Sequence, residues 1–192
     1  MSIRLRSLGA VSRHFINHLN HAISMTVTRK PLTLAIEGNE ANIRFRNGSE
    51  GSSAKIQTRF GPMELYLGQV CVSEAGVDGN HSLRTMQYRY MLTPDGHSEP
   101  RIRWEYVGYP IEDDLYCRHH VQGPIPLNLD DEANKPLTLN DLHLPTGWVP
   151  VEEVLRFCIV DLGVKPLSPD WNRILRESER LSRAEFAIMG EL

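Results

Sequence analysis

The sequence predicts an α+β fold, an antiparallel sheet (meander) packed by an N-terminal helix and two C-terminal helices. Apolar residues recur with helical spacing over residues 8–25 and again after residue 148, whereas they alternate with polar residues from Pro31 to Gly123. Pairs of glycine, asparagine and proline separate the alternating runs, as they do in a meander of strands. A continuous sheet region with helices at both ends is typical of the α+β class.

Length and composition favour a single domain over residues 1–192. With 41% hydrophobic and 23% charged residues the chain can bury a substantial core, and no change in composition divides it. We expect an N-terminal helical segment over 1–30, a sheet over 31–123 and a helical tail over 148–192. The net charge of −3 at pH 7 argues against a basic protein that coats nucleic acid.

The cysteines and the first residues favour a cytoplasmic protein. Cys71, Cys117 and Cys158 are odd in number and include no Cys-x-x-Cys pair, which argues against a disulfide framework and against a thiolate zinc site. Histidines and asparagines interrupt the apolar residues between 15 and 25, where a signal peptide would be continuous. Because no apolar run approaches the ~20 residues that span a bilayer, we expect no membrane segment.

The first predicted helix, over residues 8–25, carries three histidines beside its apolar face. At about 100° per residue, His14, His18 and His21 fall in one narrow stripe. Converging imidazoles can bind a metal ion, but no acidic residue of this helix completes a ligand set. We therefore interpret the stripe as the polar boundary of a half-buried helix, and we predict no metal and no cofactor.

Alternation continues through the predicted sheet. Strands are expected within residues 32–36, 42–46, 55–60, 63–72, 85–92 and 101–107, and turns at 37–39, 47–49, 61–62, 76–80 and 94–96. In the last hairpin, Tyr88 and Tyr90 can lie opposite Trp104 and Tyr106. This aromatic stripe could stack on the bases of a single strand, although such stripes more often form the core.

Residues 124–136 contain three prolines and predict an exposed excursion from the sheet. The next helix is expected to begin with Pro150 in its first position, followed by glutamates at the positive end of the helix dipole. Gly163 predicts its end. Ser168-Pro169-Asp170 predicts the start of the last helix.

The stretch Leu115–Gly123 gives the main indication of chemistry. In an extended strand Arg118 and His120 share a polar face with Gln122, whereas His119 points to the opposite face. If this strand lies beside residues 101–107, its polar face joins Arg103 and Glu105. A second imidazole could come from His143, in the downstream run Asp-Leu-His-Leu-Pro-Thr-Gly.

Arginine, histidine and carboxylate on one sheet face suit the cleavage of RNA without a metal. One group takes the proton of the 2′-hydroxyl, a second protonates the leaving oxygen, and an arginine stabilises the phosphorane. Histidine suits both proton roles because it titrates near neutrality. Contacts to the nucleic acid could come from Arg118, from Thr146 with the backbone of Gly147, and from the aromatic stripe of Tyr88 and Tyr90.

Two other interpretations of these histidines stay open. They could be ordinary hydrogen-bonded boundary residues, with the Leu-Pro-Thr-Gly run serving only as the turn before Pro150. They could also form a zinc site, from His119 or His120 with His143, although the spacing matches no common ligand motif. The sequence contains neither a phosphate-binding glycine loop nor a Gly-x-Ser-x-Gly nucleophile elbow.

The order of these motifs also resembles that of a known family. A Tyr-x-Tyr strand, Tyr88-Arg89-Tyr90, precedes an Arg-aromatic-acidic-Tyr strand, Arg103-Trp104-Glu105-Tyr106, then the pair His119-His120 and a C-terminal helix. Over residues 84–163 this arrangement resembles the TumE family of bacterial toxin–antitoxin toxins. The resemblance implies ribonuclease activity, neutralisation by a partner antitoxin, and functional roles for Arg103, Glu105, His119 and His120.

We therefore weigh two main functional hypotheses, and a weaker third one, a small-molecule binding domain between sheet and helices. The first is a metal-independent ribonuclease of toxin–antitoxin or defence type, with RNA and an antitoxin as partners. Its catalytic residues would be His120, His119, Arg103, Glu105 and His143. The alternative is a non-enzymatic subunit of a larger complex, which assembles with itself or with another protein through the N-terminal helix or the aromatic strands.

Overall fold

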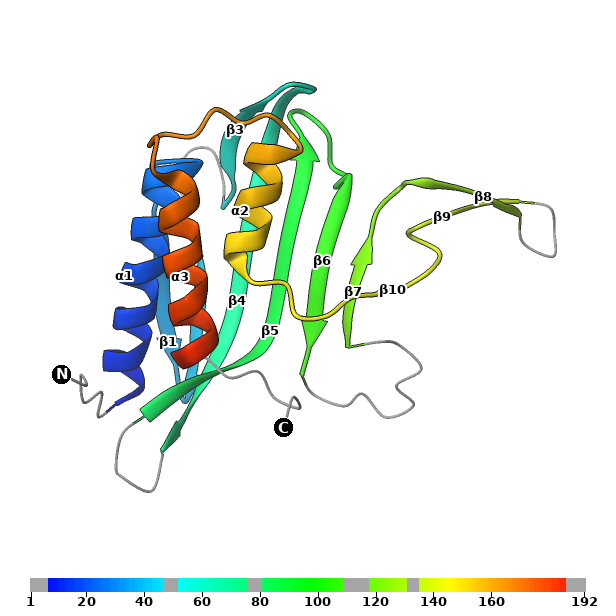
Figure 1. Cartoon of the computed structure of the whole chain (residues 1–192). Helices are drawn as coiled ribbons and strands as arrows, with labels where there is room; N and C mark the ends of the chain where they lie inside the picture. Colours follow the sequence, from blue (N-terminus) through cyan, green and yellow to red (C-terminus); the bar gives the residue numbers. More distant parts are fainter. Residues whose placement is uncertain (1–6, 47–51, 76–80, 109–117, 131–134, 186–192) are drawn as a thin grey trace.

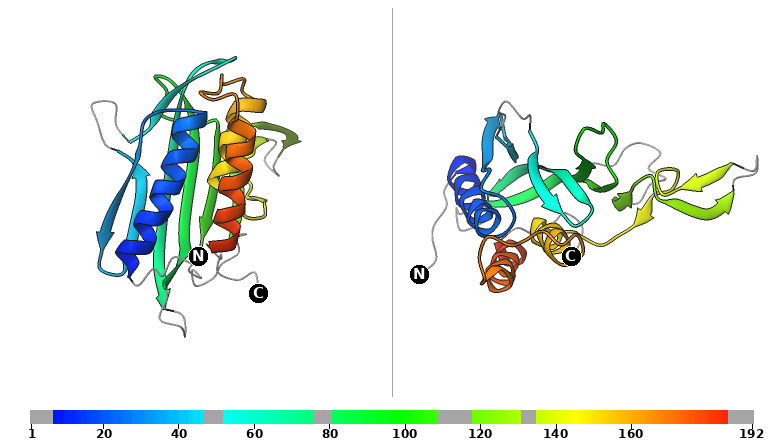
Figure 2. Two further views of the ribbon diagram at one scale, coloured as in Figure 1. Left: turned by 60° about the vertical axis from the view of Figure 1, so that its left-hand side comes forward. Right: turned by 90° about the horizontal axis from the view of Figure 1, so that it is seen from above.

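A computed structural model of the chain describes residues 7–46, 52–75, 81–108, 118–130 and 135–185. Three helices lie on one face of a large antiparallel sheet, so the predicted α+β class is confirmed (Figure 1). Seen from above, the helices lie on the same side of the sheet (Figure 2). Apolar side chains of both layers form one core between them. No helix of the described residues covers the opposite side of the sheet.

Helix α1 (Leu8–Thr26) forms where the periodicity predicts it. Ser7 caps its N-terminus, because the Ser7 Oγ accepts the N–H of Ala10 at 3.2 Å. Within the helix, Asn20 holds the start of the first strand. Its Oδ1 accepts the N–H of Leu32 at 2.7 Å, and its Nδ2 donates to the Leu32 carbonyl at 3.1 Å. The helix therefore fixes where the sheet begins.

The main sheet has the strand order β1-β2-β4-β5-β6-β7-β10, and β3 pairs with β4 as a further strand. Its strands before the projecting hairpin are β1 (Leu32–Glu37), β2 (Glu40–Phe45), β3 (Ala54–Thr58), β4 (Gly61–Ala75), β5 (His81–Pro94), β6 (Ile102–Val107) and β7 (His119–Gln122). Each of these strands overlaps a predicted one. Sequential neighbours pair antiparallel almost throughout, as in the predicted meander.

The hairpin of β5 and β6 has the predicted register. Tyr88 pairs with Tyr106 and Tyr90 pairs with Trp104, and all four aromatic side chains are buried toward the helices. The intervening residues point to the other side, which we call the open face. It carries polar side chains of several strands, among them Arg44, Tyr66, Arg89, Glu105 and His120.

After β7 the chain leaves the sheet and returns. Strands β8 (Pro126–Asp130) and β9 (Pro136–Thr138) pair as a hairpin that projects from the sheet edge (Figure 1), where the sequence predicted only an exposed excursion. Gly123 marks the departure point, because a Cβ there would lie 2.3 Å from the carbonyl oxygen of Arg101. The chain then rejoins the sheet as β10 (Leu144–Pro145), antiparallel to β7.

Helices α2 (Val151–Val160) and α3 (Trp171–Glu185) complete the helical layer. Pro150 was predicted to be the first helical residue and is instead the N-cap, with an extended ψ of 158°. Gly163, with φ of +71°, ends α2 in the left-handed conformation that favours glycine. Ser168 precedes α3 as predicted, and its Oγ accepts the N–H of Asp170 at 3.2 Å.

Glu152 is buried between α2 and α3, although it is an acidic residue. Its side chain is only 1% exposed, and one carboxylate oxygen, Oε1, accepts hydrogen bonds from the hydroxyls of Ser178 at 2.5 Å and Ser182 at 2.8 Å. Buried charges persist where such hydrogen bonds replace water. The position of Glu152 in the sequence predicted only an interaction with the helix dipole, so this link between the two C-terminal helices was not predicted.

No helix in the described part of the chain combines the length and the apolar character that crossing a membrane requires. Some predictions concern residues outside the described ranges. These are the turns at 47–49 and 76–80 and the residue Cys117. The two cysteines within the described ranges, Cys71 and Cys158, are unpaired and buried.

Candidate active site

A row of polar side chains crosses the open face at one level of the sheet. Arg89 of β5 pairs with Glu105 of β6, and Glu105 pairs with His120 of β7. Side chains that pair directly across antiparallel strands have Cβ atoms about 5 Å apart and point to the same face. The strand of the two histidines therefore lies beside β6, as the predicted site required, and the pairing makes Glu105 and His120 neighbours.

Glu105 lies at the centre of this row. Its side chain is only 10% exposed and has three basic neighbours. Arg89 Nε donates to one carboxylate oxygen, Oε1, whereas Arg103 Nη1 and His120 Nε2 each lie 3.8 Å from the other oxygen, Oε2. A nearly buried carboxylate would be costly without such partners. Glu105 therefore holds two guanidinium groups and an imidazole around one point of the sheet.

Arg103 is positioned from a second side as well. Its Nη2 donates to the Gln122 Oε1 at 2.7 Å, and the register pairs these two residues across β6 and β7. Its side chain remains 28% exposed. Two neighbours, Gln122 and Glu105, therefore fix the orientation of a guanidinium that still reaches solvent on the open face.

Strand β10 brings a second imidazole to the site. Leu144 pairs with Val121 and Pro145 pairs with His120, so the preceding residue, His143, lies beside the polar face of β7. The ring centroids of His120 and His143 are 4.7 Å apart, with the rings at 72° to each other. The four predicted residues Arg103, Glu105, His120 and His143 therefore lie together. With Arg89 and Gln122 they form what we call the open-face cluster.

The surroundings of His143 disfavour its protonated form. Desolvation of the ring lowers the pKa of His143 from its ordinary value of 6.5, and the charge of His120 lowers it further. Glu105 acts in the opposite direction, and Arg103 again lowers the pKa. The lowered pKa favours the neutral imidazole of His143, the form that can accept a proton.

We predict that an NMR titration of His143 gives a pKa below 6.5. In Glu105→Gln the pKa of His143 should fall further, because the negative charge that favours the imidazolium is lost. In Arg103→Gln it should rise, because a repelling positive charge is lost. A matched control is Glu177→Gln, an exposed carboxylate of α3, which should leave the pKa unchanged. Shifts of the opposite sign would contradict this electrostatic arrangement.

His119 lies on the helix-covered face, and its predicted catalytic role requires correction. Its Nδ1 lies 3.0 Å from the Tyr88 Oη, and its ring stacks on Tyr106 with centroids 4.2 Å apart. The N–H of Val149, just before α2, donates to the same Tyr88 Oη at 3.2 Å. Because neighbouring strand residues point to opposite faces, His119 supports the packing of α2 and does not join His120.

Three of the predicted contacts to nucleic acid are also corrected by their positions. Tyr88 and Tyr90 are each 1% exposed and stack on each other in the core, so neither ring can stack on a base. Thr146 has a buried Oγ1, and its N–H donates to the His119 carbonyl at 3.0 Å, so neither group is offered to a phosphate. Arg118 is exposed, two residues from His120, and stays a candidate for binding RNA.

The histidines of α1 lie on the opposite side of the molecule from the open-face cluster. His18 and His21 line the groove between α1 and α3, and His18 Nε2 lies 3.1 Å from the Ser178 carbonyl oxygen. Across the described ranges, no group of three or more histidine, cysteine, aspartate or glutamate side chains is arranged to hold a metal ion. The contact with Ser178 gives His18 a place in helix packing.

Two members of the cluster, Arg89 and Gln122, were not among the predicted site residues. A signal for both was present in the sequence. Arg89 lies between Tyr88 and Tyr90, so the predicted pairing of these tyrosines with Tyr106 and Trp104 places Arg89 opposite Glu105. Gln122 lies two residues after His120 on β7, so it points to the same face. Extending the strand register from the aromatic pairs to the neighbouring residues would have placed Arg89 and Gln122 on the open face.

The chain matches no protein-family model, no curated protein and no solved structure.

Proposed function

We propose that this protein is a metal-independent ribonuclease whose active site is the open-face cluster. The observation that carries the proposal is the meeting of His120 and His143, whose ring centroids are 4.7 Å apart, beside Glu105 and Arg103. Two imidazoles can divide the two proton transfers of RNA cleavage between them. A guanidinium beside them can stabilise the charge that develops on the phosphorus oxygens.

His143 takes the role of general base. Its lowered pKa leaves the imidazole neutral at neutral pH, so it can accept the proton of the ribose 2′-hydroxyl. The 2′-oxygen then attacks the phosphorus and forms the new P–O bond. The bond from phosphorus to the 5′-oxygen of the next nucleotide breaks, and the first product carries a 2′,3′-cyclic phosphate.

His120 takes the role of general acid. It delivers a proton to the departing 5′-oxygen, and the Glu105 carboxylate, 3.8 Å from its Nε2, balances the charge of the imidazolium. Arg103 faces the developing charge of the phosphorane, held by Gln122 at 2.7 Å. Arg89 keeps the carboxylate in place from the far side. Glu105, Arg89 and Gln122 are thus positioning residues in this scheme.

We further propose a toxin–antitoxin or defence setting, in which a partner protein blocks the site. The support is the resemblance of residues 84–163 to the TumE family. Of the four positions that this resemblance carries over, Arg103, Glu105 and His120 are members of the open-face cluster. A partner antitoxin would act most directly by covering the open face, since no helix of the described residues lies there.

The experiment that tests the proposal is an RNA cleavage assay with purified protein in excess EDTA. We expect cleavage of single-stranded RNA into fragments with 2′,3′-cyclic phosphate and 5′-hydroxyl ends. The same sequence made with 2′-deoxyribose should remain intact, because it lacks the attacking oxygen. Cleavage of the deoxy strand, or loss of activity in EDTA, would contradict the mechanism, and intact RNA under all conditions would contradict the function.

The projecting hairpin favours a second candidate function, a subunit that assembles with another protein. Three exposed apolar side chains flank the hairpin, namely Ile125, Leu142 and Leu144, which are 44%, 42% and 52% exposed. Exposed apolar residues that gather beside a projecting element are typical of contact surfaces. Light scattering of the purified protein, alone and with RNA, separates the two functions. A stable oligomer that neither binds nor cleaves RNA would favour the subunit.

A further inference from the structure

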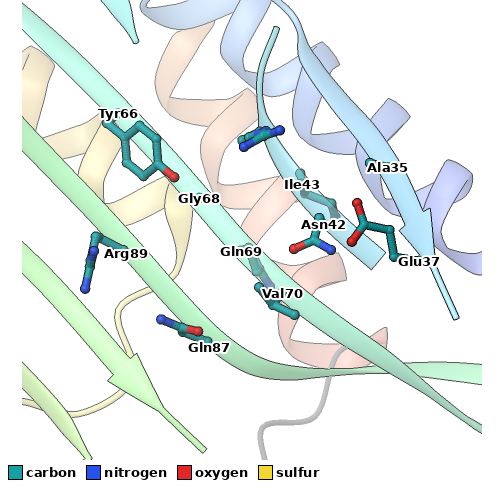
Figure 3. A pocket seen from close by; sticks show the side chains of 11 residues that line it. Ala35, Glu37, Asn42, Ile43, Tyr66, Gly68, Gln69, Val70, Gln87 and Arg89 are labelled. Carbon is teal, nitrogen blue, oxygen red and sulfur yellow. The ribbon is translucent and has the colours of Figure 1, made fainter. Parts of the chain in front are cut away.

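A groove lies on the open face beside the cluster, over strands β1, β2, β4 and β5 (Figure 3). Its volume is about 320 Å³, within the range of pockets that hold small ligands. Its lining is mostly polar and includes Glu37, Asn42, Arg44, Gln87 and Arg89. Arg89 belongs both to this lining and to the open-face cluster, because it also donates to Glu105. The groove and the cluster are therefore adjoining parts of one surface.

The floor of the groove holds an aromatic ring laid over a glycine. Tyr66 and Gly68 lie two residues apart on β4, and Figure 3 shows the Tyr66 side chain directed along the strand toward Gly68. A Cβ at Gly68 would lie 2.6 Å from the Tyr66 Oη and 2.8 Å from its Cε1. One side of the ring is thus seated on the glycine backbone. The Tyr66 side chain is nevertheless partly exposed to the groove.

Two arginines of the groove lining lie on the strands to either side of Gly68. The register pairs Gly68 with Arg44 of β2 on one side and with Arg89 of β5 on the other. The same cross-strand row continues through Glu105 to His120. With a spacing of about 4.8 Å between strands, three spacings from Gly68 to His120 correspond to about 14 Å. An extended polymer can therefore contact the ring and the cluster together.

From this arrangement we infer that the groove binds an unpaired nucleotide of the same single-stranded RNA, a short distance along the strand from the cleaved phosphate. The base stacks on the exposed side of Tyr66, and Arg44 and Arg89 contact the phosphates on either side. Asn42 and Gln87 provide amide groups for the edge of the base. The inference rests on the proposed ribonuclease function and extends it to substrate recognition, because it requires an unpaired base.

The chemistry of the lining favours this occupant over others. An unpaired base offers a flat ring for stacking and a phosphate backbone for arginines, and proteins that bind single strands combine these two elements. A duplex keeps its bases stacked on each other, so it cannot place one on Tyr66. A free phosphate would use the arginines and would leave Tyr66 without a role. Tyr66 is therefore the residue whose replacement distinguishes these ligands.

The test uses the full chain carrying His120→Ala and His143→Ala, so that RNA is bound without being cut. Binding of a fluorescein-labelled single-stranded RNA hexanucleotide is measured by fluorescence anisotropy. Adding Tyr66→Leu should weaken binding by about tenfold or more, the usual effect of losing one stacked base. Tyr66→Phe, which keeps the ring, should bind like the parent. Phe60→Leu removes an aromatic side chain that is 64% exposed outside the groove, and serves as the matched control.

An abasic oligonucleotide of the same length isolates the stacking contribution. It should bind more weakly than RNA, and Tyr66→Leu should not change its affinity. If Tyr66→Leu binds RNA as well as the parent, or loses the same affinity for the abasic strand, the inference is wrong even if the wild type cleaves RNA. If binding depends on Tyr66 but the wild type cuts nothing, the groove holds single strands and the ribonuclease proposal fails alone.

Discussion

Replacing His120 or His143 with alanine should lower the rate of RNA cleavage by about 10²–10⁴-fold, the usual contribution of general acid–base catalysis. In the proposed mechanism each replacement removes one of the two proton transfers, whereas Arg103 would still stabilise the phosphorane. The double variant should lose less than the product of the two single effects, because the two groups act in one step. Initial rates on a short fluorescent RNA, measured with enzyme in excess, give these numbers directly.

Two other histidines serve as controls for this experiment. His97 is exposed in the turn between β5 and β6, so His97→Ala should cleave RNA at the wild-type rate. His119→Ala should lower the melting temperature, since its ring stacks on Tyr106, while the folded protein keeps its rate. If His119→Ala lost as much cleavage rate as His120→Ala, the proposal that the active site lies on the open face would be wrong.

Replacing Glu152 with alanine should destabilise the folded protein by about 2–4 kcal/mol. The substitution deprives the buried hydroxyls of Ser178 and Ser182 of their acceptor, and it truncates a residue that is 1% exposed. The midpoint of urea unfolding should fall while the slope is retained. Glu152→Gln keeps an acceptor oxygen at the same position along the side chain, so it should lose less stability than Glu152→Ala.

The neighbouring glutamate provides the matched control. Glu153 has a side chain that is 43% exposed and pairs with Arg156 at 3.3 Å. Exposed pairs of this kind contribute at most about 1 kcal/mol, so Glu153→Ala should unfold close to the wild type. Equal losses in Glu152→Ala and Glu153→Ala would show that burial of the carboxylate does not link α2 to α3.

Periodicity alone predicted most of the fold, because each element has one face in the core. Alternation located the strands, and the tyrosines of β5 set their register against Trp104 and Tyr106. The hairpin of β8 and β9 was missed because it forms outside the main sheet, so its strands show no alternation against a core. Three prolines in that region also argued for an irregular excursion.

The sequence predicted which residues meet on the open face better than it predicted the extent of the cluster. Alternation separated His119 from His120, and pairing of β6 with β7 then brought Arg103 and Glu105 to the same face. His143 could be named only as a candidate, because its approach depends on the return of β10 to the sheet edge. The groove around Tyr66 could not be predicted, because it is formed by strands that lie far from the histidines in the sequence.

The backbone around His120 is held by more strand pairing than the backbone around His143. His120 lies in a strand with neighbours on both sides, whereas His143 precedes β10, a strand of only two residues. One of the two residues of β10 is Pro145, which has no N–H to donate to the neighbouring strand. Local opening of strand β10 would separate the rings of His120 and His143 while the core stays folded. Fraying of this one edge would therefore separate His143 from His120 at a free energy far below that of global unfolding.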